Sequence, residues 1–416
     1  MRKWIGIAAV YLIFSAVAFG AGSVTLEGKV TDAAGKPLQH ATVLVYHAGV
    51  KTGYSVFCPS CYADCGKRAL TDSTGTYIFK NLAPDLWFEL AVVRDGYVPT
   101  FIEGVDPSGG SAPVAVLRVR SGLDPLKMAR GRVIDPNGNP MSDVLVQTKG
   151  VLTPQGAMIG QIGGLEPLAV TNDNGEFETA YVEPASKMLF FVEARTMAPQ
   201  FVVLPTGTER HTVRLTEGAV IRGRLVENGK GVGNAEVGLI PKDQGGWGPD
   251  FKMSGSPFEE MKIGTHEDGS FAITNVPSAV EWYVYGKMAS LVGRGATEPV
   301  ICSVAKEKQQ VDLGNIEVKP GRRLRGRVVL GDDSTIPSGM RITIESKRLW
   351  DFQTTTLGPD GRFEFADLFP GEYTITPAVR GYSAPDGTRS IPVSVDRDVD
   401  NWSVVLARQA NGQAPR

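Results

Sequence analysis

Two short phrases, repeated in the same order four times, constrain this chain more than any other feature. The first phrase is 28–38, GKVTDAAGKPL, in which a strand runs into a turn that contains Asp32, Gly35 and Pro37. These residue types suit a tight turn, because glycine adopts positive φ, aspartate bonds its own backbone and proline presets φ. The second phrase, 71–79, TDSTGTYIF, is again a turn followed by alternating strand residues.

Both phrases return three times. The first returns at 131–141, 223–229 and 326–333, and the second at 171–177, 265–271 and 358–363. The leading glycines of the first phrase are Gly28, Gly131, Gly223 and Gly326, about one hundred residues apart. A fixed period of this kind indicates four copies of one β domain rather than a single large domain.

Each copy contains about seven short alternating strands separated by turns, which is typical of a two-sheet β-sandwich. The 49 glycines and 27 prolines suit strands that are joined by many turns. We therefore predict an all-β tandem array of four sandwiches and a short disordered tail, with boundaries at 21–122, 123–216, 217–318, 319–408 and 409–416. Because the linkers are short, we expect the four sandwiches to form an extended rod with limited freedom between neighbours.

Residues 1–20 are typical of a signal peptide, since Arg2 and Lys3 precede an apolar run that ends in small residues. The alternative is an uncleaved anchor, because the run 4–21 is close to the lower limit for spanning a bilayer. We predict an exported protein, periplasmic, secreted or at the cell surface, that meets a membrane only through this segment. The net charge of −2 predicts no nucleic-acid partner.

The paired phrases, together with the turn and strand at 368–375, LFPGEYTI, resemble the carboxypeptidase regulatory-like domain. This domain is a transthyretin-like Greek-key β-sandwich that is similar to the wider carbohydrate-binding-like sandwiches. The resemblance covers nearly all of the chain after residue 20 and is weakest in copy three, which lacks the Asp and Pro of the first phrase. It implies a fold without a catalytic residue, in a family whose usual roles are structural, adhesive or sugar-binding.

No catalytic motif accompanies the repeats. A zinc carboxypeptidase site needs His-x-x-Glu and a distant His, yet none of His40, His47, His211 and His266 has Glu three positions later. A Gly-x-Ser-x-Gly nucleophile elbow and a P-loop are also missing from the sequence. We therefore predict a protein that is not an enzyme and that uses no metal or other cofactor.

The copies differ most at one position, between the strand after the first phrase and the start of the second phrase. Copies one to three carry long insertions at 46–70, 147–170 and 241–264, whereas copy four has only 346–355. Insertions at one topological position lie at one end of each sandwich, where binding loops are usually found. We define these four segments as the variable loops.

Aromatic residues in the variable loops are the candidate ligand-binding residues. Trp247 and Phe251, and then Tyr54 and Tyr62, have rings that can stack on a sugar, so we predict a structural or adhesive array that binds polysaccharide or a cell-surface protein. In the alternative interpretation these rings fold down and cover the end of the sandwich, because large apolar side chains are usually buried. A third hypothesis is an accessory subunit that docks a secreted hydrolase or an outer-membrane complex through these loops. Trp350 fits more than one of these interpretations.

Three of the four cysteines lie in the variable loop of copy one. Cys58, Cys61 and Cys65 fall within eight residues, and Cys302 is far away in copy three. Export favours a disulfide, so we predict a loop staple between Cys65 and either Cys58 or Cys61, with Cys302 either pairing with the remaining cysteine or forming a buried free thiol. A thiolate metal site with His47 as a further ligand is less favoured, because a second Cys-x-x-Cys pair is missing.

Overall fold

The structure is a computed structural model, and it describes residues 23–53, 55–57, 60, 62–120, 124–243, 251, 260–384 and 387–408. Several predictions from the sequence fall outside these residues, namely the signal peptide at 1–20, the tail at 409–416, Tyr54, Cys58, Cys61 and Trp247.

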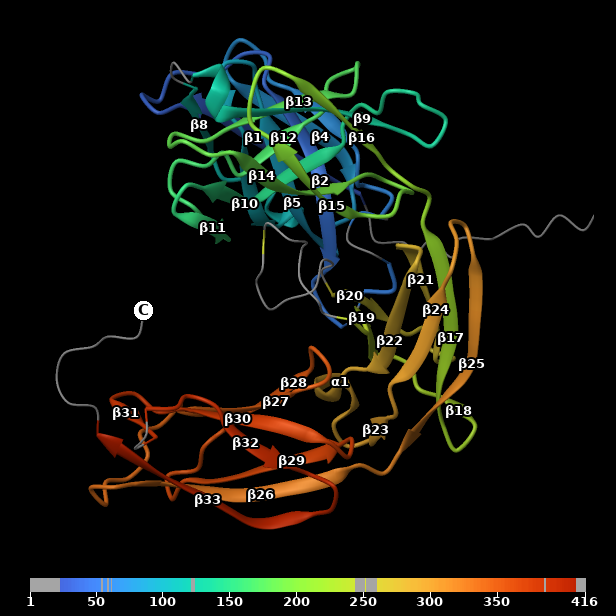
Figure 1. Cartoon of the computed structure of the whole chain (residues 1–416), viewed down its shortest axis with the longest axis vertical. Coiled ribbons are helices and arrows are strands. Elements are labelled where there is room, and N and C mark those ends of the chain that lie inside the picture. Colours follow the sequence, from blue (N-terminus) through green and yellow to red (C-terminus); the bar gives the residue numbers. More distant parts are fainter. Residues whose placement is uncertain are drawn as a thin grey trace, which may run out of the picture.

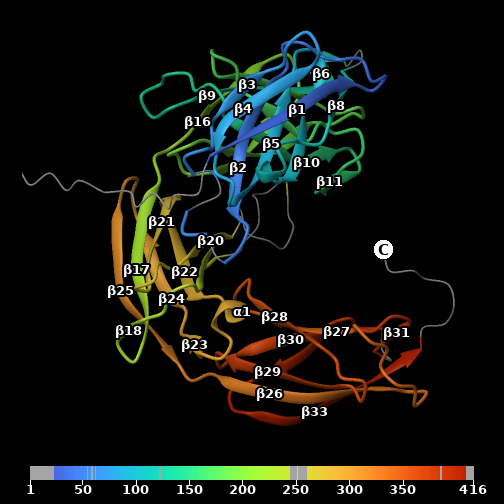
Figure 2. The same cartoon turned by 180° about the vertical axis from the view of Figure 1, so that it is seen from behind.

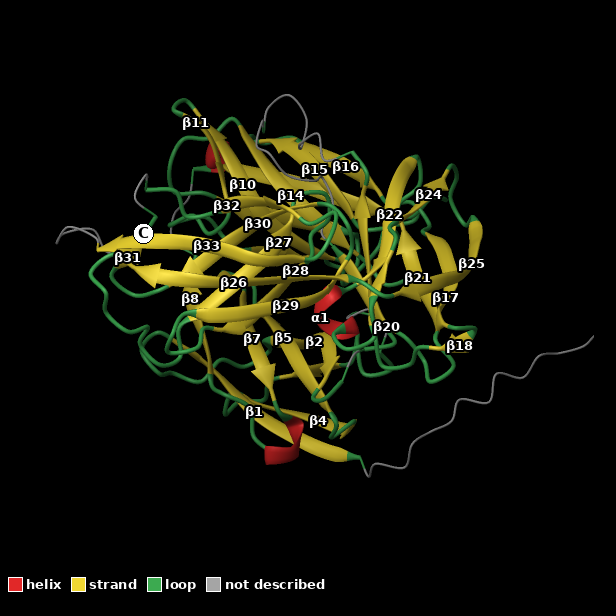
Figure 3. Cartoon of the chain, turned by 90° about the horizontal axis from the view of Figure 1, so that it is seen from below, coloured by secondary structure: helices red, strands yellow, loops and turns green. Residues whose placement is uncertain are grey.

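Every quarter of the chain forms two sheets from its own strands, and none of the sheets in the described ranges mixes strands from two quarters. Each pair of sheets encloses one apolar core. The prediction of an all-β tandem array of sandwiches is thus confirmed. Figure 3 shows strands throughout the molecule. Within the described residues, the helices are limited to α1 (Met288–Leu291) and two short 3-10 turns, Pro107–Gly109 and Pro125–Lys127.

The first and second sandwiches come from the N-terminal half of the chain. The first contains β1 (Val24–Asp32), β2 (Thr42–Val50), β3 (Arg68–Leu70), β4 (Thr76–Leu82), β5 (Leu86–Val93), β6 (Tyr97–Val98), β7 (Thr100–Val105) and β8 (Ala115–Val119). The second contains β9 (Met128–Ile134), β10 (Leu145–Thr153), β11 (Gly156–Ile159), β12 (Leu168–Val170), β13 (Glu176–Ala180), β14 (Lys187–Glu193), β15 (Gln200–Pro205) and β16 (Arg210–Arg214).

The third and fourth sandwiches complete the chain. The third contains β17 (Ala219–Glu227), β18 (Lys230–Gly231), β19 (Glu236–Pro241), β20 (Met261–Gly264), β21 (Ser270–Val276), β22 (Val280–Gly286), β23 (Ala296–Thr297), β24 (Val300–Val304) and β25 (Gln310–Lys319). The fourth contains β26 (Arg322–Leu330), β27 (Arg341–Ser346), β28 (Phe352–Thr356), β29 (Arg362–Leu368), β30 (Glu372–Ala378), β31 (Tyr382–Ser383), β32 (Ile391–Ser394) and β33 (Val399–Arg408).

All four sandwiches share one strand order. The first strand of each lies between the strand of the second phrase, which is antiparallel to it, and the last strand of the same sandwich, which is parallel to it. The same arrangement holds for β9, β17 and β26. The other sheet of each sandwich is antiparallel throughout. The third sandwich therefore has the fold of the others although its sequence phrases are the weakest.

The leading glycine of the first phrase lies under an aromatic ring of the second phrase. Gly28 is paired with Tyr77 across β1 and β4, and a Cβ on Gly28 would lie 2.3 Å from the ring. The equivalent pairs are Gly131–Phe177, Gly223–Phe271 and Gly326–Phe363, where the Cβ would lie 2.2 to 2.7 Å from the ring. Only glycine leaves room for the ring to cover the neighbouring backbone, so these two residues in each copy depend on one another.

The turn glycine of the second phrase joins the two phrases through the backbone. Gly75 has a φ of +73°, and its carbonyl accepts a hydrogen bond of 2.8 Å from the Val30 N–H. The same bond measures 2.8 Å at Gly175, 2.9 Å at Gly269 and 2.9 Å at Gly361. A Cβ on Gly75 would lie 2.5 Å from the Val30 carbonyl oxygen, so both the conformation and the close approach require glycine.

A buried threonine at the start of the second phrase connects the two sheets of the first three sandwiches. The Thr71 hydroxyl accepts a hydrogen bond from the Ala41 N–H at 2.8 Å and donates one to the Leu38 carbonyl at 2.6 Å. Thr171 and Thr265 make the corresponding pairs of bonds. The fourth sandwich has a buried Leu357 at this position, so it replaces the polar bridge with apolar packing.

The expected extended rod is wrong. Figures 1 and 2 show the first two sandwiches side by side, with the third and fourth following in a curve. Leu44 and Tyr46 of the first sandwich pack against Leu145 and Leu168 of the second. The β2 sequence, TVLVYHAGV, is apolar at odd and even positions, so this sheet is covered on both faces, and the side-by-side packing buries its outward face.

We expect the leading glycine to tolerate no side chain. Gly131→Ala should lower the free energy of unfolding of the second sandwich by about 1–3 kcal/mol, because the new methyl group overlaps the Phe177 ring. Differential scanning calorimetry measures the change. Gly49→Ala is the matched control, since it also lies in a strand but a Cβ there meets no atom within 4 Å. Equal transition temperatures for Gly131→Ala and the wild type would contradict this account.

The hydroxyl of Tyr77 gives a second prediction. It is buried without a hydrogen-bond partner among the described residues, and burial raises the pKa of Tyr77 to about 12. The other three sandwiches have Phe at this position. Tyr77→Phe should therefore raise the free energy of unfolding by about 1 kcal/mol, because an unsatisfied polar group is removed. In the control Tyr373→Phe, which removes a hydroxyl that donates to the Phe369 carbonyl at 2.5 Å, stability should fall. Loss of stability in both variants would show that the Tyr77 hydroxyl is satisfied.

Candidate functional site

The four variable loops occupy one topological position in the structure. They connect β2 to β3, β10 to β12, β19 to β20 and β27 to β28. In each of them, the described residues include some that contact a neighbouring sandwich. The variable loops thus form joints between sandwiches.

The first loop contacts the third sandwich. The Gly264 N–H, at the end of β20, donates a hydrogen bond to the Ser55 carbonyl. Gly53 lies close to the side chain of Asn234, whose Oδ1 would be 3.1 Å from a Cβ at Gly53. The first and third sandwiches, which are not adjacent in the sequence, are thereby linked.

The second loop is joined to the first sandwich by an ion pair. The Arg120 guanidinium, just after β8, donates to Glu166 in two bonds, Nε to Oε1 at 2.7 Å and Nη2 to Oε2 at 3.1 Å. The Glu166 carboxylate also accepts the Ala180 N–H at 3.1 Å. Burial raises the pKa of Glu166, and the opposite charge of Arg120 counteracts only part of this effect. A bidentate pair of this kind fixes orientation as well as distance.

The third loop reaches back to the second sandwich through Phe251. This ring is 0% exposed, and one of its carbons would lie 3.4 Å from a Cβ at Gly150 in β10. Because Gly150 has no side chain, the Phe251 ring packs against the backbone at this position. Phe251 holds the second and third sandwiches together and has no face that is open to solvent.

The short fourth loop docks on the third sandwich. Leu349 and Trp350 pack with Ile240 and Tyr285 in one apolar cluster. The Trp350 carbonyl accepts a hydrogen bond of 2.6 Å from the Lys287 ammonium group. Trp350, which fitted more than one interpretation of the sequence, is thus a residue of a joint between sandwiches.

A buried charged group lies at the centre of this joint. Lys287 Nζ is 2.6 Å from Glu260 Oε1 and 3.6 Å from Asp351 Oδ1. The Tyr285 hydroxyl donates to Glu260 at 2.7 Å, and the Met288 N–H donates to Asp351 Oδ2 at 2.9 Å. Burial raises the pKa of Asp351 to about 6, against the opposing effect of the Lys287 charge.

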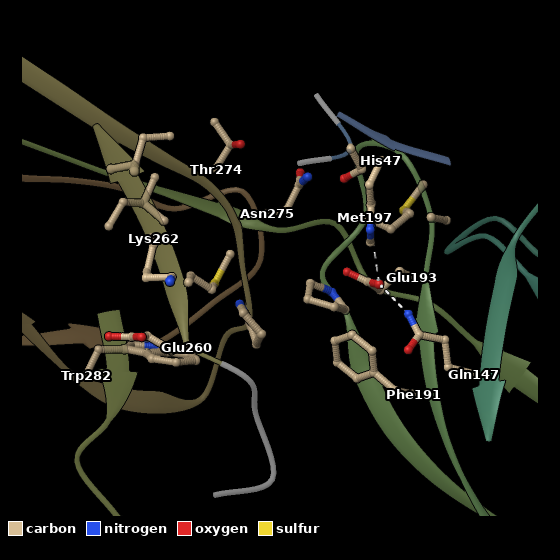
Figure 4. A pocket seen from close by; sticks show the side chains of 17 residues that line it. His47, Gln147, Phe191, Glu193, Met197, Glu260, Lys262, Thr274, Asn275 and Trp282 are labelled. Carbon is tan, nitrogen blue, oxygen red and sulfur yellow. Dashed lines mark hydrogen bonds and ion pairs between the residues drawn. The ribbon is translucent and has the colours of Figure 1, made fainter. Parts of the chain in front are cut away.

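A cavity of about 210 Å³ lies where the first three sandwiches meet, and we name it the interdomain cleft. Figure 4 shows His47, Gln147, Phe191 and Glu193 on one wall, facing Lys262 and other residues of the third sandwich on the opposite wall. Carboxylate and ammonium groups thus face the same space from different sandwiches. The walls are otherwise mainly apolar, with Met197, Met261, Ile263 and Trp282 among the lining residues.

The polar groups on the His47 side of the cleft bond mainly to one another. His47 Nδ1 is 2.7 Å from Glu89 Oε2, and its Nε2 is 3.8 Å from Glu193 Oε2. The same Glu193 oxygen accepts the Tyr46 hydroxyl at 2.6 Å and the Gln147 amide at 3.4 Å. Within the described residues, three or more His, Cys, Asp or Glu side chains nowhere converge to hold a metal ion.

The four aromatic candidates divide into two pairs. Tyr62 is only 8% exposed and belongs to the core of the first sandwich, where its hydroxyl contacts that of Ser55, and Phe251 is fully buried. A buried ring has no free face for a sugar. The alternative interpretation, in which the rings cover the end of their own sandwich, describes Tyr62, whereas Phe251 packs against the second sandwich at Gly150. Trp247 and Tyr54 lie outside the described residues, and ligand binding by them stays a prediction.

The structure describes two of the four cysteines. Cys302 is a buried free thiol beside Trp282 in the β22–β24 pairing, and burial raises its pKa. Cys65 is buried in the core of the first sandwich. Cys58 and Cys61 are outside the described part of the chain, so the disulfide staple stays a prediction.

Sequence reasoning missed the charged residues of the joints. Arg120 and Glu166 are separated by 46 positions, and Lys287 and Asp351 by about 64, without a motif that relates them. The one available signal was Lys287, a lysine that directly follows the apolar strand β22.

In the described ranges, none of the helices has the length and apolar character needed to cross a bilayer.

Two segments match known family models. Residues 25–120 match the carboxypeptidase regulatory-like domain. Residues 320–405 match the second β-sandwich domain of the BOS complex subunit NOMO1-like family. The first and fourth sandwiches are thus each matched by a family model, and the two models are different.

Comparison with solved structures finds matches of low sequence identity and low TM-score. The Bacillus anthracis TIE protein is 10% identical, with 89% of this chain and 68% of that chain covered and a TM-score of 0.19. A streptococcal ancillary pilin is 13% identical, with 68% and 99% covered and a TM-score of 0.22. The major pilin subunit of Bacillus cereus is 11% identical, with 94% and 100% covered and a TM-score of 0.18. At these scores the likeness carries no conclusion about activity or assembly. No curated protein matches the sequence.

Proposed function

Because this chain is a β-sandwich repeat protein of the carboxypeptidase regulatory-like type, we propose that it is a non-catalytic structural module. In this proposal the protein is exported and serves as a curved spacer or adhesion element in the periplasm or at the cell surface. One observation carries the proposal: all four variable loops contribute contacts between sandwiches. The part of the chain that varies between copies therefore sets the shape of the array.

The joints have the properties that a fixed shape requires. Sandwiches that are connected only by linkers rotate freely, whereas large apolar contacts between domains limit such motion. The first joint combines an apolar cluster with the bidentate Arg120–Glu166 pair. At the last joint, Met288 of the third sandwich lies in the core of the fourth. We infer that the array behaves in solution as a stiff curved body.

Small-angle X-ray scattering tests this stiffness. The wild-type chain should give one compact curved shape, and Leu349→Asp should increase the radius of gyration, because it places a charge in the apolar joint of the third and fourth sandwiches. Circular dichroism should remain that of folded β-sandwiches. Phe352→Ala is the matched control, since this neighbouring residue is 54% exposed. A wild-type profile typical of flexibly linked domains would refute the proposed function.

We extend the proposal to carbohydrate recognition through Trp247 and Tyr54. Both are aromatic residues of the variable loops, whereas Tyr62 is buried in the core of the first sandwich and Phe251 is buried against Gly150 of the second. A glycan array should show binding that Trp247→Ala reduces at least tenfold and that Trp87→Ala leaves unchanged, because Trp87 is an exposed tryptophan outside these loops. A stable protein partner in a pull-down, without any glycan signal, would instead favour an accessory docking subunit.

A further inference from the structure

A second cavity, of about 360 Å³, lies between the third and fourth sandwiches, and we name it the joint cavity. Its walls are mainly apolar and come from both sandwiches. They include Met288 and Leu291 of α1, Leu349 of the fourth loop, and Phe369, Pro370 and Tyr373 before and within β30. The joint cavity is distinct from the interdomain cleft, since the two share no lining residue.

One charged side chain lines this apolar space from a deeply buried position. Asp351 is 2% exposed, and its Oδ2 accepts the Met288 N–H at 2.9 Å. Its Oδ1 is buried and accepts no hydrogen bond from any described residue. The nearest cation is Lys287 Nζ at 3.6 Å, which is beyond hydrogen-bonding distance. A buried carboxylate oxygen without a donor is costly, so this atom is a site for an external donor.

The charged groups around Asp351 bond mainly to other partners. The Lys287 ammonium group is bonded to Glu260 and to the Trp350 carbonyl, both at 2.6 Å. One ammonium group therefore faces two carboxylates. The other cations that line the cavity are engaged elsewhere: Arg348 lies over the Tyr283 ring at 4.6 Å, and Lys347 is 4.0 Å from Glu372.

We propose that the joint cavity binds a small cationic amine with a compact apolar body, whose ammonium group donates a hydrogen bond to Asp351 Oδ1. The apolar walls match the body of such a ligand, and the buried oxygen fixes its orientation, as in other small-molecule sites. An anionic ligand would be repelled by the Asp351 carboxylate that lines the cavity. An apolar ligand without a donor would leave Oδ1 unsatisfied.

The pH dependence of binding follows from the same carboxylate. Asp351 has a raised pKa of about 6, so it is ionised above pH 6 and takes up a proton below it. Protonation removes the charge that attracts the amine, and affinity should therefore fall as the pH is lowered from 7.5 to 5. The other titratable groups that face this region are Lys287, Glu260, Tyr285, Tyr373, Lys347 and Glu372.

Isothermal titration calorimetry on the full chain tests the proposal with benzylamine, and with benzyl alcohol as the neutral probe of similar shape. Benzylamine should bind with one-to-one stoichiometry at pH 7.5, at least tenfold more tightly than benzyl alcohol. Asp351→Asn should abolish this preference. Glu345→Gln is the matched control and should bind benzylamine as the wild type does, because Glu345 is an exposed carboxylate of β27 that does not line the cavity.

Three results would overturn the proposal. They are the absence of saturable benzylamine binding, equal affinity for the two probes, and an unchanged preference in Asp351→Asn. If Asp351→Asn does not fold, the pH dependence of benzylamine binding to the wild type replaces this variant. Equal benzylamine affinity at pH 7.5 and pH 5 would also refute the role of the carboxylate. None of these results bears on the stiffness of the array, so this proposal and the proposed function fail separately.

Discussion

The contact between a backbone glycine and an aromatic ring is the interaction on which each sandwich depends. In all four copies the ring of the second phrase covers the glycine that opens the first phrase. The contact joins the first strand to a strand that follows 37 to 49 residues later and fixes their register. The backbone bond from the turn glycine, 2.8 to 2.9 Å in every copy, secures the same pair of segments. These few residues are common to all four copies, whereas the variable loops are free to differ from copy to copy.

That freedom is used at the joints. The variable loops differ in length and content, and each one makes its own set of contacts with another sandwich. An aromatic ring lies against the bare backbone at Gly150, a bidentate ion pair links Arg120 to Glu166, and a buried ammonium group lies between the third and fourth sandwiches. If all joints were alike, any two sandwiches could pack together and the chain could adopt many overall arrangements. Because the joints differ, they specify one arrangement of the four sandwiches. The curved shape in Figures 1 and 2 is therefore a property of the loops more than of the sandwiches.

The two cavities differ in how their polar groups are satisfied. In the interdomain cleft, His47, Glu89 and Glu193 lie on the surfaces of two sandwiches that face one another, and they bond to each other and to Tyr46. In the joint cavity, Asp351 has one oxygen with a backbone donor and one oxygen without any donor among the described residues. The first arrangement stabilises the packing of sandwiches. The second leaves Asp351 Oδ1 without a hydrogen-bond donor among the described residues, 3.6 Å from the Lys287 ammonium group, beside a mainly apolar space.

The sequence by itself determined the repeated unit. The turn residues that follow Gly28 and precede Tyr77 lie within a few positions of one another, and both phrases recur at a regular period. Turn chemistry and strand alternation were therefore enough to predict four sandwiches and the position of the variable loops. Only the tertiary structure decided how the sandwiches pack and what the loops contact. Leu44 and Leu145 are simply apolar residues in strands until two sheets face each other. Lys287 and Asp351 become a buried pair only when the third and fourth sandwiches meet. Contacts between copies join residues that no periodicity relates, and their energy depends on burial, which a sequence pattern does not contain.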